Sequence, residues 1–155
     1  MFRRSRHTAA PTRLPDDQLS IAWQVCSLLL DYPSEALLAR LELARRAAGE
    51  LPAYLAEPVC RVVDHLESTP LGQVQRDFVE TFDHTRRGCL YLTYFTTGDT
   101  RKRGVALVRL KQAYRRAGVE LTSGELPDHL AVVLEFGATA DIEAAWRILN
   151  DYRAS

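Results

Sequence analysis

Apolar side chains recur every three or four positions along most of this chain, which is the spacing of one face of an α-helix. The first run begins near Asp16 or Ser20 and ends at Tyr32. Its apolar positions are Ile21, Val25, Leu28 and Leu29. Pro33 ends this helix, because the residue before a proline is pushed out of the α region.

Three further helices are predicted in the N-terminal half. Ser34 has the side chain of an N-cap and begins the second one. The third begins at Pro52 and includes Pro58, whose ring and missing N–H predict a delayed start or a kink. Thr69 followed by Pro70 is typical of an N-cap and a first helical residue, and predicts the fourth.

The C-terminal half has one ambiguous segment followed by three helices. Residues 90–96 have the composition of a strand, but the sequence offers no second strand to pair with them, so we expect a short helix or a packed loop. A long helix follows and is stopped by Gly118. Pro127 is predicted to start the next helix and Asp141 to cap the last. The pattern predicts an all-α fold of about six or seven helices.

Length and composition are those of one soluble globular domain: 155 residues, of which 46% are apolar and 26% charged. Residues 1–15 are rich in arginine, threonine and proline without periodicity, and we expect them to form a flexible basic tail before a single helical domain at residues 16–155. No run approaches the roughly 20 apolar residues of a membrane span, and no signal peptide follows the first residues. We therefore expect a cytoplasmic protein without stable membrane insertion.

The charges cancel overall but are unevenly distributed. Residues 14–83 carry twelve acids and five bases, whereas residues 84–116 carry nine bases and one acid. Residues 117–155 are acidic again, with seven acids and two bases. This distribution favours complementary helix faces or a partner site, and a pI of 6.9 argues against nucleic acid.

No pattern of catalytic or metal-binding residues is present. Three cysteines, Cys26, Cys60 and Cys89, are too sparse for a disulfide framework and lack a CxxC metal spacing. The four histidines also lack ligand spacing. We expect no metal, no cofactor and no enzymatic activity.

In residues 22–33, in three segments between residues 78 and 104, and in residues 125–136, the chain resembles the NarJ-like family of nitrate reductase delta subunits, also known as molybdenum cofactor assembly chaperones. Residues 125–136, with their acidic residue, proline, aspartate and histidine, are similar to a signature of the wider TorD-like redox enzyme maturation chaperones. The other matching segments are residues 22–33, 78–83, 89–94 and 98–104. Several ordered motifs together are more specific than any one of them.

The resemblance implies a TorD-like fold and binding without catalysis. Family members hold the N-terminal peptide of the apo catalytic (alpha) subunit of a molybdenum nitrate reductase and assist cofactor insertion. They continue into further helices, so we expect this fold to be shortened at its C-terminal end. The alternative is a generic α-helical peptide- or RNA-binding adaptor. The sequence leaves open whether the chain forms a homodimer.

The first candidate binding segment is Glu125 together with Pro127, Asp128 and His129. If Pro127 begins a helix, both carboxylates lie near its N-terminus, where they are exposed and can pair with a basic amphipathic peptide. The alternative is a capped helix start with a packed histidine.

The second candidate is an aromatic run between arginines. Its members are Leu90, Tyr91, Tyr94, Phe95, Arg87 and Arg103. Aromatic side chains provide contact area for a bound helix. The alternatives are a buried aromatic cluster and a solvated basic face.

Overall fold

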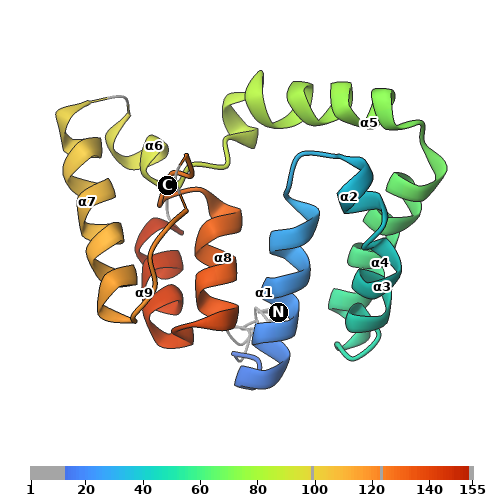
Figure 1. Cartoon of the computed structure of the whole chain (residues 1–155), viewed down its shortest axis with the longest axis horizontal. Helices are drawn as coiled ribbons and strands as arrows, with labels where there is room; N and C mark the ends of the chain where they lie inside the picture. The colour runs from blue at the N-terminus through green and yellow to red at the C-terminus, as the bar shows by residue number, and fades with distance from the viewer. Residues whose placement is uncertain (1–12, 99, 123, 154–155) are drawn as a thin grey trace, which may run out of the picture.

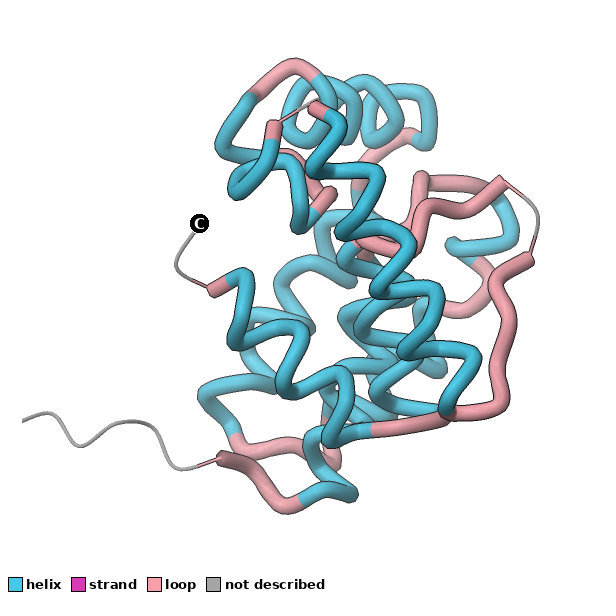
Figure 2. The backbone as a smooth tube through the Cα atoms, turned by 90° about the vertical axis from the view of Figure 1, so that its left-hand side faces the viewer, coloured by secondary structure: helices cyan, strands magenta, loops and turns pink. Residues whose placement is uncertain are grey.

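The computed structural model describes residues 13–98, 100–122 and 124–153, and the regular elements in these ranges are helices (Figure 1). Figure 2 shows the same helices joined by loops. In chain order the α-helices are α1 (Asp16–Leu29), α2 (Glu35–Leu38), α3 (Leu41–Ala48), α4 (Ala53–Ser68), α5 (Leu71–Phe78), α6 (Leu92–Thr97), α7 (Arg101–Arg116), α8 (Leu130–Thr139) and α9 (Ile142–Tyr152). A π-helix (Val79–Asp83) and a 3-10 turn (Arg86–Gly88) lie between α5 and α6.

The predicted all-α class is confirmed, and the number of helices is corrected. The described residues contain nine α-helices rather than six or seven. One reason is that the second predicted helix is two pieces, α2 and α3, with Ala39 and Arg40 between them. The other is that residues 92–97, which overlap the ambiguous segment, form α6.

α1 lies at the centre of the fold and joins two apolar cores. On one side it packs against α8, and on the other against α3 and α4 (Figure 1). The first core includes Trp23 of α1 and Phe136 of α8, and the second includes Val25 of α1 and Val63 of α4. Apolar side chains on different faces of α1 therefore belong to the two cores.

Two predicted caps are confirmed. The side chain of Ser34 accepts a hydrogen bond from the Leu37 N–H at 3.2 Å, and that of Asp141 accepts one from Ala144 at 2.9 Å. Each bond satisfies one of the backbone donors left free at a helix N-terminus.

Three expected helix features need correction. The delayed start considered for Pro58 is wrong, because α4 begins at Ala53 and continues through Pro58, whereas the kink stays a prediction. The fourth helix begins at Leu71, with Pro70 rather than Thr69 in the N-cap position. Pro127 does not begin a helix, because α8 starts at Leu130.

The last part of the expected tail packs against the domain. Arg13 forms ion pairs with Asp16 at 2.8 Å and Glu143 at 2.6 Å, and lies over the ring of Trp146. Leu14 packs against the core between α1 and α9. Arg13 and Leu14, which the prediction placed in the tail, therefore contact the domain, while residues 1–12 lie outside the described part.

None of the helices among the described residues combines the length and the apolar character needed to cross a membrane.

Candidate functional site

The two candidate segments meet each other, although they lie about 35 residues apart. The Leu130 N–H donates to the Leu90 carbonyl at 2.7 Å, and the Leu92 N–H to the Asp128 carbonyl at 2.9 Å. Tyr91 and His129 form an isolated antiparallel bridge. Their rings pack edge to face, with 5.1 Å between the ring centres. The expectation of no second strand holds among the described residues, where the two segments meet in this isolated bridge and not in a sheet.

The pairing explains why Pro127 does not begin a helix. The backbone of His129 is extended (φ −64°, ψ 129°), so the helix can begin only after it. Pro127 is fully buried, and its carbonyl accepts a hydrogen bond from the hydroxyl of Tyr114 on α7. Burial raises the pKa of Tyr114, and the charge of Asp128 adds to this shift, so the hydroxyl stays a donor.

Asp128 is buried, and its expected exposure to a bound peptide is wrong. Its side chain is 0% exposed, and Oδ2 accepts hydrogen bonds from the N–H and the hydroxyl of Thr93, at 3.2 and 2.6 Å. The guanidinium of Arg103 lies 3.5 Å from the same oxygen. Oδ1 has no hydrogen-bond partner among the described residues. Asp128 therefore fastens the loop before α8 to α6 and α7.

Arg103 belongs to the same network. It donates from Nε to the Thr93 hydroxyl at 3.2 Å and lies 5.7 Å from the centre of the Tyr91 ring. Its side chain is 19% exposed, so most of it is engaged inside the protein. Arg87, by contrast, is exposed on the 3-10 turn.

The aromatic run divides into a buried part and an exposed part. Leu90 is in the core, and Tyr91 is half-buried against His129. Tyr94 and Phe95 are 36% and 38% exposed and meet edge to face. Only the last two present a substantial aromatic surface to solvent.

Beside this network is a polar hollow of about 400 Å³. From the predicted site it contains Tyr91, Glu125 and His129. Its other charged side chains come from distant elements: Asp31 after α1, Arg40 before α3 and Glu135 on α8. Three carboxylates against one guanidinium make the hollow acidic, so it favours a cationic ligand group.

His129 has a fixed tautomer in this hollow. It is the N-cap of α8, where its Nδ1 accepts a hydrogen bond from the Ala131 N–H at 3.2 Å. Nδ1 must therefore be unprotonated in this arrangement. Burial lowers the pKa of His129, while the charges of Asp128, Asp31 and Glu125 oppose that shift.

An apolar groove of about 500 Å³ lies on the other side of the end of α1. Its walls come from α1, α4, α5 and the π-helix, and they include Leu29, Val62, Phe78 and Phe82. Val62 is 43% exposed there. Cys26 also lines the groove, and burial raises the pKa of its thiol, so it behaves as an apolar side chain.

Asp31, Arg40 and Glu135 are not among the site residues predicted from the sequence, and neither is the groove. The signal for part of the hollow was present: Gln24, Ser27 and Asp31 follow one another at helical spacing among the otherwise apolar residues 21–31. The groove had no such signal, because its residues were assigned to the core faces of separate helices.

Metal binding has no support among the described residues, where histidine, cysteine and carboxylate side chains form no cluster of three or more. The expectation of no metal and no cofactor stays a prediction.

The fold is shared with a class of maturation factors. A crystal structure of a candidate redox enzyme maturation protein from Archaeoglobus fulgidus superposes with a TM-score of 0.58 at 23% identity, covering 96% of this chain and 82% of that one. At this level of identity the match establishes the all-helical fold alone.

The family is established by sequence. The model of the family described as "nitrate reductase delta subunit" matches residues 46–151, and the chain belongs to this family. It is 34% identical over 133 residues to a probable nitrate reductase molybdenum cofactor assembly chaperone, NarJ, of Bacillus subtilis, covering 85% of this chain and 72% of that protein.

Two other relatives are much longer than the matched region. The nitrate reductase-like protein NarX of Mycobacterium tuberculosis is 42% identical over 138 residues, which is 88% of this chain but 21% of that protein. The assembly chaperone NarJ of Escherichia coli is 34% identical over 130 residues, 82% of this chain and 55% of that protein. The chain thus spans from about a fifth to about half of these two relatives.

Proposed function

We propose that this chain acts as a chaperone that binds the N-terminal segment of the apo catalytic (alpha) subunit of a molybdenum nitrate reductase. In this role it assists cofactor insertion and assembly in the cytoplasm, acts by binding rather than catalysis, and holds no cofactor of its own. The names of the Bacillus and Escherichia relatives support the client and the role.

The observation that carries the proposal is the presence of an acidic hollow and an apolar groove on the two sides of the end of α1. Leu28 and Asp31 line the hollow, and Leu29 and Leu30 line the groove. A basic amphipathic segment has both kinds of group to offer. Its cations suit the carboxylates, and its apolar face suits the groove.

The predicted site residues take different parts in this proposal. Glu125 and His129 contact the client in the hollow together with Tyr91, while Tyr94 and Phe95 extend the contact area outside it. Pro127, Asp128, Leu90 and Arg103 are buried or largely engaged, so they position these groups instead of touching the client. Arg87 stays a contact candidate because it is exposed.

The test is calorimetry of the protein with a peptide copied from the N-terminus of a co-encoded nitrate reductase catalytic subunit. Glu125→Gln/Glu135→Gln removes two exposed carboxylates of the hollow, and Val62→Asp puts a charge in the groove. We expect each change to weaken binding by about 1–3 kcal/mol, the usual cost of a charge-assisted contact or a misplaced charge.

The matched control is Glu42→Gln/Glu50→Gln, which removes the same charge from exposed positions on and after α3. Its affinity should equal that of the original protein. Unchanged binding by both test variants would overturn the proposal. Tighter binding of RNA than of the peptide, with an affinity that falls steeply with salt, would favour the adaptor alternative.

A further inference from the structure

The outward face of α7 carries a strip of basic side chains. Six exposed cations lie on this helix, which contains no acidic residue: Arg101, Lys102, Arg109, Lys111, Arg115 and Arg116. Val105 and Val108, each 53% exposed, lie among them, on the side opposite the buried Leu110 and Tyr114. We call these eight exposed residues the basic stripe.

Local stability explains only part of the basic stripe, since the helix dipole favours Arg115 and Arg116 in the last turn of α7 but none of the other four cations. Arg101 and Lys102 lie in the first turn of α7, where the helix dipole disfavours cations. Lys111 and Arg115 are four residues apart, where like charges repel each other. Among the described residues, Arg115 alone of the six cations has an acid within ion-pair distance, Glu120 at 4.0 Å.

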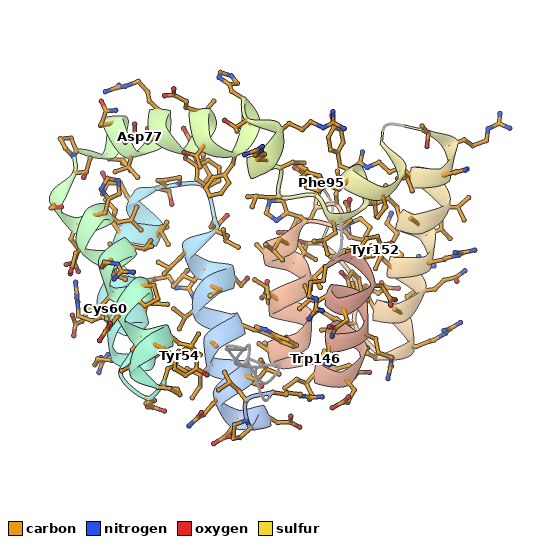
Figure 3. All side chains as sticks on the ribbon, turned by 180° about the vertical axis from the view of Figure 1, so that it is seen from behind. Tyr54, Cys60, Asp77, Phe95, Trp146 and Tyr152 are labelled. Carbon is orange, nitrogen blue, oxygen red and sulfur yellow. The ribbon has the colours of Figure 1, made fainter. Side chains whose placement is uncertain are left out.

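The basic stripe also lies at the positive end of a molecule with separated charge. α7 forms one edge of the fold, and α3 and α4 form the opposite edge (Figure 1). Residues 84–116 carry nine bases and one acid, whereas residues 14–83 carry twelve acids and five bases and residues 117–155 seven acids and two bases. Figure 3 shows side chains of α7 that end in nitrogen and point away from the body of the protein. Near a negatively charged surface, such a charge distribution orients the protein so that α7 faces that surface.

We propose that the basic stripe binds reversibly to an anionic phospholipid surface. α7 has 16 residues and is therefore about 24 Å long, and as an outermost, protruding helix it fits a flat surface. Val105 and Val108 gain apolar contact in the lipid interface, whereas against nucleic acid they would face phosphate and water. The proposal is independent of client binding.

The test is cosedimentation of the full chain with vesicles of phosphatidylcholine, with and without phosphatidylserine. We expect binding only to the vesicles that contain phosphatidylserine, and less of it as salt rises. Each cation near such a surface changes the partitioning of a protein onto it about fivefold. Arg109→Gln/Arg116→Gln should therefore weaken binding to the phosphatidylserine vesicles on the order of 25-fold. Arg46→Gln/Arg61→Gln, on α3 and α4, removes the same charge and should change it less than about twofold.

Circular dichroism of both variants verifies that the helices are intact. Equal binding to neutral vesicles, no binding to either kind, or an equal loss in the control variant would each overturn the proposal. Salt-sensitive multimers that the Arg109/Arg116 variant abolishes would assign the stripe to a contact between copies of this chain. Tighter binding of a nucleic acid duplex than of the vesicles would assign it to nucleic acid instead.

Discussion

Asp128 belongs to the signature segment of the family, but its side chain is buried and a ligand cannot contact it. It receives both hydrogen bonds that Thr93 can donate and lies beside the Arg103 guanidinium, at zero exposure. Burying a carboxylate is costly unless such partners are present. The residue therefore serves to hold Tyr91 and His129 in place at the polar hollow.

Replacing Asp128 should mainly affect stability. Asp128→Ala is expected to lower the free energy of unfolding by about 3 kcal/mol, because it removes two hydrogen bonds and leaves Arg103 without its partner. Urea unfolding followed by circular dichroism measures this loss. The control Glu125→Gln changes an exposed carboxyl nearby and should stay within about 0.5 kcal/mol. Comparable stability of the two variants would show that the buried network contributes little.

At the scale of helices, α1, α8 and α9 approach one another closely at Gly137. Gly137 of α8 faces the ring of Trp23 and the methyl group of Ala145, and a Cβ built on it would lie well inside van der Waals contact with both. Trp23 in turn stacks on Trp146, with ring centres 6.3 Å apart. The three helices can pack this closely because position 137 has no side chain.

Gly137→Ala should therefore destabilise the protein even though alanine is the better helix former. Overpacking costs about 1–3 kcal/mol, against a gain in helix propensity of about 1 kcal/mol, and because the added methyl group would overlap the Trp23 ring we expect a net loss of about 1–2 kcal/mol. Gly104→Ala in α7 is the matched control. No atom lies near its added methyl group, and it should stabilise the protein by about 0.5–1 kcal/mol. Differential scanning calorimetry of both variants would contradict this packing argument if their melting temperatures moved in the same direction.

At the scale of the whole molecule, the N-terminal residues tie α1 to α9. Arg13 bonds to Glu143 across the fold, and Leu14 contributes to the core between these helices. These contacts connect the first described residues to α9. The core that Leu14 packs against also contains side chains of α7 and α8.

Two deletions separate this contact from the residues before it. Removing residues 2–12 should leave the melting temperature nearly unchanged, because these mostly polar or small residues, three of them arginines, offer little apolar area. Removing residues 2–14 also removes Leu14 and should lower it by about 2–5 °C. Thermal scans that show the same effect for both deletions would mean that Arg13 and Leu14 do not stabilise the domain.

The sequence by itself determined the helical class, most helix positions and the family signature. Periodicity, caps such as Ser34 and Asp141, and the stop at Gly118 depend on residues a few positions apart, so they can be read along the chain. Charge separation is also a property of the sequence, since it needs only the order of acids and bases.

The tertiary structure alone decided which of the signature residues face solvent. The pairing of residues 90–92 with 128–130 holds His129 extended, starts α8 at Leu130 and buries Asp128. The hollow and the groove likewise combine side chains of helices that are distant in sequence. Burial depends on which distant parts of the chain pack against a residue. The spacing of residues along one helix does not determine these contacts.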